Sequence, residues 1–162
     1  MENIYLILGI FILFMVGKAL FADRSPIPEA SEKVNKVTES ASLDAILSSN
    51  KHVVVDFYAN WCPPCRAIAP VFSSLADKHA STGHLAFAKV NTDEVKDVSA
   101  KYGVSALPTF MFFTDGVPKG VAVEGLPSGH SVNVNKDGLV VKVLGADRRA
   151  LEAVVKVLAS KE

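Results

Sequence analysis

The sequence predicts an α/β domain in which helices cover both faces of a central mixed sheet, with an apolar helix before it. Three observations carry this prediction. Strand-like and helix-like segments alternate from residue 33 to residue 158. The segment 53–58 is apolar except for Asp56, which is typical of a strand that helices cover on both sides. Cys62 and Cys65, the chain's two cysteines, follow this strand where an amphipathic helix begins.

Composition limits the classes of protein that the chain can belong to. It has 162 residues, with 17 basic and 17 acidic ones and a formal net charge of +0. Without the first 32 residues about 130 remain, enough for one domain, and we expect a monomer without a nucleic-acid partner. Two cysteines are too few for a disulfide framework, which favours a reactive pair over a structural one.

Residues 1–22 predict a hydrophobic anchor. Residues 4–16 are all apolar or glycine, and the apolar run resumes at 19–22. If the run is taken to continue across Lys18, it has about 19 residues. As a helix it would be about 28 Å long, which is close to the thickness of a bilayer. We therefore expect a transmembrane helix that contacts the membrane through residues 4–22. The basic Lys18 and Arg24 follow the apolar run, which favours a domain in the cytosol.

Two other roles for this segment stay open. A cleaved secretory signal also fits, because 13 apolar residues suit its hydrophobic region and Gly17-Lys18-Ala19 offers small residues for cleavage. It would send the domain into the secretory pathway or outside the cell, but Glu2 and the lack of basic residues before residue 4 argue against it. A mitochondrial presequence is disfavoured, because no Arg-rich amphipathic helix is present.

The remaining chain divides into a linker and one domain. Residues 23–32 contain two prolines and scattered charges without apolar periodicity, so we expect a linker, with the domain over 33–162. Ser40 or Ser42 is expected to cap the first helix of the domain, and Pro70 to kink the second. The expected elements are strands at 33–37, 53–58, 85–91, 109–113 and 140–144, and helices at 43–47, from Cys62 to His79, at 95–102 and at 147–158.

Several separated markers point to one known family. Asp56 lies six residues before Cys62 and Pro70 five after Cys65; the other markers are Trp61, Lys89, Pro108, Gly116 and Gly145. With these residues the chain resembles the thioredoxin family over about 33–158. The resemblance implies the thioredoxin fold, a redox disulfide between Cys62 and Cys65, and a cis proline at Pro108 that faces this disulfide.

The chain departs from the family pattern at three places. Pro63-Pro64 stands where most thioredoxins have Gly-Pro, and the resulting WCPPC box is similar to that of some plant h-type and fungal thioredoxins and of tryparedoxins. Leu107 precedes Pro108 where isoleucine, threonine or methionine is usual. An insert at about 117–139 makes the last hairpin about 20 residues longer, and it can form a lengthened β-hairpin or a loose loop.

The residue types fit dithiol chemistry. Cys62 at a helix start is expected to be the nucleophile, because unsatisfied N–H groups and the helix dipole stabilise its thiolate. Cys65, one turn deeper, is then the resolving thiol. Asp56 is expected to exchange protons with Cys65, and Lys89 to tune Asp56. The residues expected to bind substrate are Trp61, Pro63, Pro64, Leu107 and Pro108.

The sequence therefore predicts a protein-disulfide reductase. The resemblance implies disulfide-containing client proteins, a thioredoxin reductase as the electron donor, and no bound cofactor. A secreted or lumenal oxidase or isomerase is the alternative, and the intact cysteine pair argues against a non-enzymatic adaptor. No metal is expected, because zinc normally takes four ligands and the histidines show no paired spacing. These histidines are His52, His79, His84 and His130.

Overall fold

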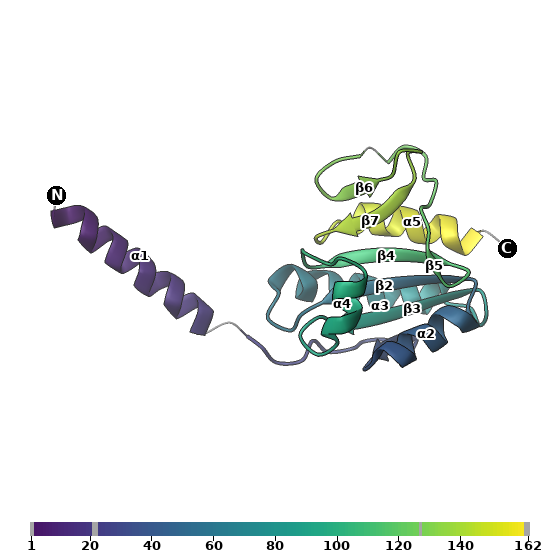
Figure 1. The fold of residues 1–162 in the computed structure, drawn as a ribbon, viewed down its shortest axis with the longest axis horizontal. Coiled ribbons are helices and arrows are strands. Elements are labelled where there is room, and N and C mark those ends of the chain that lie inside the picture. Colours follow the sequence, from purple (N-terminus) through teal and green to yellow (C-terminus); the bar gives the residue numbers. More distant parts are fainter. Residues whose placement is uncertain (1, 21–22, 127, 161–162) are drawn as a thin grey trace.

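The computed structural model describes residues 2–20, 23–126 and 128–160, and Figure 1 shows a helix, α1 (Glu2–Leu20), set apart from an α/β domain. The large apolar side chains between Ile4 and Val16 are exposed. A membrane span needs about 20 predominantly apolar residues. Among the described residues, no helix is both long and apolar enough to cross a bilayer. The transmembrane helix expected over residues 4–22 is therefore not supported, and residues 21–22 of that prediction lie outside the described ranges.

Strands and helices alternate through the domain as the sequence predicts. They are β1 (Val34–Val37), α2 (Ser40–Ser49), β2 (His52–Tyr58), α3 (Pro63–His79), β3 (Leu85–Asn91), α4 (Lys96–Lys101), β4 (Thr109–Thr114), β5 (Val117–Pro118), β6 (Val132–Val134), β7 (Val140–Leu144) and α5 (Arg148–Ser160). Every expected element is present, and β5 and β6 are additional. The N-cap of α2 is Glu39 rather than either predicted serine, and the Ser42 hydroxyl accepts a hydrogen bond from the Glu39 N–H at 3.3 Å.

The strands form one mixed sheet in the order β1-β3-β2-β4-β7-β6, and β5 pairs with β4. The strands β1, β3 and β2 run parallel, whereas β4, β7 and β6 each run antiparallel to the preceding neighbour in this order. All residues of β2 are buried, and its register with β3 sets Asp56 beside Lys89. Paired residues of neighbouring strands point to the same face of a sheet, so these two side chains share one face.

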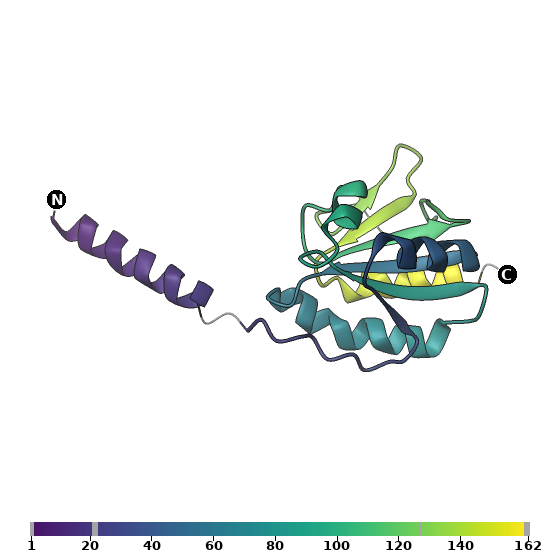
Figure 2. The same cartoon turned by 60° about the horizontal axis from the view of Figure 1, so that its bottom comes forward.

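Helices cover both faces of the sheet, as Figure 2 shows. On one face, Val54 of β2 shares a core with Phe72 of α3 and Leu151 of α5. On the other face, the neighbouring Val55 shares a core with Leu43 of α2 and the residues around α4. Asp56 follows Val54 by two residues along the strand, so its side chain points to the same face. It therefore lies on the α3 side, under the helix that begins after Cys62.

The described residues of the segment 117–139 include two short strands, β5 and β6, so the expected lengthened hairpin is present in this part of the chain. Its strand β6 pairs with β7, and Val121 is buried and bridges to Val140. Gly120 permits this packing, because a Cβ atom there would lie 2.6 Å from the Leu139 Cβ. The segment therefore adds β6 at the β7 edge of the sheet.

Candidate active site

The two cysteines form a disulfide at the N-terminus of α3. Their Cα atoms are 5.3 Å apart, and Cys62 is the N-cap residue of the helix. Pro63 and Pro64 occupy the first two helical positions, where their fixed φ suits the helix and their missing N–H groups leave no unsatisfied donor. The Cys65 N–H therefore becomes the first backbone donor of the helix.

This donor points at the sulfur of Cys62. The Cys65 nitrogen lies 3.3 Å from the Cys62 Sγ. A helix of 17 residues also places the positive end of its dipole at this sulfur. Both effects stabilise negative charge on Cys62 once the disulfide is reduced, which is the property that an attacking thiolate requires.

An open groove of about 400 Å³ borders Cys62. Its lining residues are Trp61, Cys62, Pro63, Pro64, Thr92, Val104, Ser105, Ala106 and Leu107. Trp61 is 45% exposed, and its indole N–H donates to the Asp93 Oδ2 at 2.9 Å, which fixes the ring at the groove edge. Four of the five residues expected to bind substrate thus line one groove.

The fifth of these residues, Pro108, lies behind the groove. It is buried, the Leu107–Pro108 peptide bond is cis, and the Pro108 carbonyl accepts a hydrogen bond from the Gly145 N–H at 2.8 Å. Leu107 packs against the cluster that contains both cysteines. Pro108 therefore positions Leu107 rather than lining the groove itself.

Cys65 faces a second, internal space on the other side of the disulfide. A cavity with a volume of about 10 Å³ lies between α3 and the sheet. Cys65, Asp56 and Lys89 line it, together with Glu29 and Tyr58. This volume is enough for a single water molecule. Cys65 and the predicted proton-exchanging acid therefore line the same cavity.

Asp56 is buried, with 4% of its surface exposed, and its Oδ1 atom has no hydrogen-bond partner among the residues that the structure describes. Burial raises the pKa of Asp56 to about 7, the positive charge of Lys89 opposes this rise, and the negative charge of Glu29 adds to it. An acid with this pKa exists in both protonation states at neutral pH, so it can take up or release a proton there.

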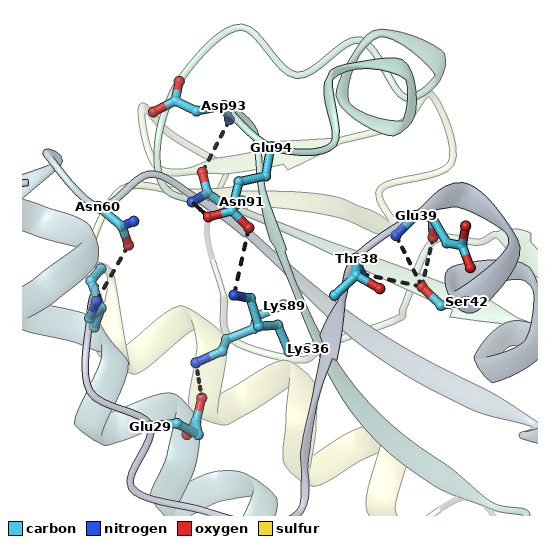
Figure 3. Close-up of polar contacts among 11 residues, drawn as sticks. Glu29, Lys36, Thr38, Glu39, Ser42, Asn60, Lys89, Asn91, Asp93 and Glu94 are labelled. Carbon is cyan, nitrogen blue, oxygen red and sulfur yellow. Dashed lines mark hydrogen bonds and ion pairs between the residues drawn. The ribbon is translucent and has the colours of Figure 1, made fainter. Parts of the chain in front are cut away.

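Lys89, expected to tune Asp56, makes its direct contact with another acid. Its ammonium forms an ion pair and hydrogen bond with the Glu29 carboxylate, as Figure 3 shows. The Ser73 hydroxyl also donates to this carboxylate, at 2.7 Å. Burial opposes ionisation of Glu29, but the hydrogen bonds from Lys89 and Ser73 outweigh it and hold the Glu29 pKa below its usual value.

Sequence reasoning missed Glu29. It belongs to the segment 23–32, which was expected to be a linker, whereas the structure packs this segment along α3 (Figure 2). Pro26 and Pro28 restrict the backbone to an extended path, which was the only local signal available.

Comparisons with known proteins agree with this geometry. The model of the thioredoxin family matches residues 33–136. A thioredoxin-like protein of Fusarium culmorum is 54% identical over 92 residues, which cover 57% of this chain and 74% of that protein. The thioredoxin of Neurospora crassa is 42% identical over 105 residues, which cover 65% of this chain and 81% of that protein.

Solved structures give the same result. The oxidised thioredoxin of Plasmodium falciparum is similar with a TM-score of 0.59 and 30% identity, over 78% of this chain and 99% of that one. The thioredoxin of Malassezia sympodialis is similar with a TM-score of 0.59 and 28% identity, over 78% of this chain and 91% of that one. The family match spans more than half of the chain and includes both cysteines, so the chain belongs to the thioredoxin family and is a protein-disulfide oxidoreductase.

Proposed function

We propose that this chain reduces disulfides of client proteins and is itself reduced by a thioredoxin reductase. One observation carries the proposal: the two cysteines border different spaces. Cys62 borders the open groove, and Cys65 borders the smaller cavity that Asp56 also lines. An attacking thiol has to reach its substrate, whereas a resolving thiol has to lose a proton, and these two environments match those two tasks.

In the first step, a client segment lies in the groove beside Trp61 and Leu107. The Cys62 thiolate attacks one sulfur of the client disulfide. A bond forms between Cys62 and that sulfur, the client S–S bond breaks, and the second client sulfur leaves as a thiolate that takes a proton from solvent. The Cys65 N–H and the helix dipole stabilise the thiolate before it attacks.

In the second step, Cys65 resolves the mixed disulfide. Its thiol gives a proton to the Asp56 carboxylate, directly or through one water in the cavity, and its sulfur attacks the Cys62 sulfur. The bond between Cys62 and the client breaks, the client sulfur leaves as a thiolate that takes a proton from solvent, and the Cys62–Cys65 disulfide forms. Asp56 then returns its proton to solvent. Two electrons have then moved from the dithiol to the client disulfide, and the reductase supplies two electrons for the next cycle.

Substitution of each cysteine tests this division of roles. Cys62→Ser should abolish the reduction of insulin disulfides, and full retained activity would remove the assignment. Cys65→Ser should also stop turnover but accumulate a mixed disulfide with the client, seen as a mass increase that dithiothreitol reverses. The same adduct on Cys62→Ser would show that the two roles are exchanged.

The reduction potential tests the direction of electron flow. A potential near about −270 mV marks a reductant such as thioredoxin, whereas about −180 mV or above marks an isomerase or oxidase. Redox titration of the intact protein in glutathione or dithiothreitol buffers measures this value. A potential near the upper value would replace the proposed reductase with a lumenal oxidase or isomerase.

The compartment is part of the same proposal. We place the domain in the cytosol, because cytosolic reductants keep a dithiol in the reduced form that the first step needs. Protease treatment of organelle preparations from cells that express a tagged chain tests this location. Digestion of the tag without permeabilisation supports the cytosol, and protection of the tag would place the domain inside a secretory or mitochondrial compartment.

A further inference from the structure

The residues 23–31, called the strap below, run along α3 and attach to it near the disulfide. The Arg66 guanidinium donates to the carbonyls of Asp23 and Ser25 and lies 3.4 Å from the Asp23 carboxylate. The Ile27 N–H donates to the Asn60 side chain at 3.4 Å, and Ile27 packs against the cysteine cluster. The first half of the strap is therefore held beside the redox site.

The second half of the strap is attached further along the same helix. The Ser31 hydroxyl donates to the Asp77 carboxylate at 2.6 Å. Just after the strap, the Lys33 ammonium donates to the Asp77 carbonyl at 2.9 Å. With both halves fixed, the strap crosses the side of the cavity that the sheet and α3 leave uncovered, and Ile27 and Glu29 line that cavity.

Glu29 lies between these two attachments and directs its carboxylate inward. One oxygen accepts from the Ser73 hydroxyl at 2.7 Å and from the N–H of Ala30 at 3.0 Å, and the other binds the Lys89 ammonium (Figure 3). The Glu29 side chain is 29% exposed and that of Lys89 is 11% exposed. The ion pair therefore sits at the boundary between cavity and solvent.

The charges around the cavity make this ion pair important for Asp56. The titratable groups that line it are Asp56 and Tyr58 from β2, Lys89 from β3, Cys65 from α3 once reduced, and Glu29 from the strap. Lys89 is the one cation among these lining residues. It lowers the pKa of Asp56, whereas Glu29 raises it. Removing the negative charge of Glu29 would leave Lys89 unbalanced beside Asp56 and make Asp56 a weaker base.

We propose that Glu29 is a positioning residue of the redox reaction: its carboxylate holds the Lys89 ammonium at the cavity mouth and keeps Asp56 basic enough to take the Cys65 proton. The inference rests on the proposed function, because it concerns the proton that Cys65 releases in the second step. Glu29 does not line the groove beside Cys62, so it acts on the reaction through its ion pair with Lys89.

The titration of Asp56 tests this role directly. The carboxyl ¹³C signal of Asp56 would be followed by NMR across pH 4–10 in the reduced, full-length wild-type, Glu29→Gln and Glu29→Asp proteins. We expect the midpoint to fall by about one pH unit in Glu29→Gln, the usual effect of a single nearby charge. Glu29→Asp keeps the charge and should recover most of the wild-type midpoint. An unchanged midpoint in Glu29→Gln would overturn the inference.

A matched control separates charge at the cavity from loosening of the strap. Asp23→Asn removes another strap carboxylate, the one that pairs with Arg66 and does not line the Asp56 cavity. Its Asp56 midpoint should equal that of the wild type, and a fall as large as that in Glu29→Gln would contradict a specific role for Glu29.

Insulin reduction in the same samples connects the titration to catalysis. Glu29→Gln should shift the acidic limb of the rate profile to lower pH, because Asp56 then ionises at lower pH, and should lower the plateau rate above that limb, because Asp56 is the weaker base. A purely structural loss would instead lower the rate evenly at all pH values. A wild-type protein that is inactive toward insulin would overturn the proposed function itself. An active wild type with an unshifted profile in Glu29→Gln would overturn only the role of Glu29.

Discussion

Ionisation of Asp56 costs folding free energy, and Asp56→Asn should recover that free energy. Burial raises its pKa from the ordinary 3.8 to about 7. At 1.36 kcal/mol per pH unit, this difference corresponds to about 4 kcal/mol. The folded state binds the proton more tightly than the unfolded state, so the free energy of unfolding falls as pH rises from about 4 to about 7 and then levels off. Asparagine has a similar shape and no charge, so the variant avoids this loss.

Urea unfolding of the oxidised proteins, followed by circular dichroism, measures the effect. At pH 4 the wild type and Asp56→Asn should agree within about 1 kcal/mol, because Asp56 is then protonated in the fold. At pH 8.5 the variant should be more stable by up to about 4 kcal/mol. Asp137→Asn, at an exposed hairpin position, is the control and should show no such growth. A variant that is no more stable than the wild type at pH 8.5 would refute the burial argument.

Two further substitutions test the groove and the hairpin. Trp61→Ala removes an aromatic ring that is 45% exposed and hydrogen-bonded to Asp93. It should raise the KM for insulin about tenfold and change the free energy of unfolding by less than about 1 kcal/mol. An unchanged KM would show that clients do not use this edge of the groove. Gly120→Ala places a Cβ 2.6 Å from that of Leu139 and should cost about 1–3 kcal/mol in urea unfolding, whereas Gly129→Ala, with nothing within 4 Å, should be nearly neutral.

The sequence predicted the elements of the domain well, because its signals there are local. The apolar patterns of strands and helices, and the glycines that end helices, depend only on residues close in the sequence. The observed β3 and β7 accordingly have the predicted bounds. Asp56 and Lys89 are register partners on two adjacent parallel strands. The sequence predicted both strands, and it also predicted that these two residues act together.

Glu29 shows where this reasoning stops. Its partners Ser73 and Lys89 lie 44 and 60 residues away in the sequence. The segment that carries it has neither strand nor helix periodicity, so nothing local distinguishes a residue that reaches a buried cation from an exposed acid in a linker. Such a contact is a tertiary property, and it became visible only when the fold brought the strap, α3 and β3 together.

The Pro63-Pro64 dipeptide departs from the family pattern, but this departure has little effect on how the helix start stabilises the Cys62 thiolate. The side chain of an N-cap residue accepts hydrogen bonds from the second or third helical N–H, not from the first. Gly-Pro and Pro-Pro both place proline at the second position, so in either case the third N–H is the available donor, and here it is that of Cys65, 3.3 Å from the Cys62 sulfur. Proline at position 63 therefore removes a donor that the sulfur does not use. The thiolate keeps the stabilisation that the helix start provides, and the dipeptide alone gives no reason to expect an oxidant instead of a reductant.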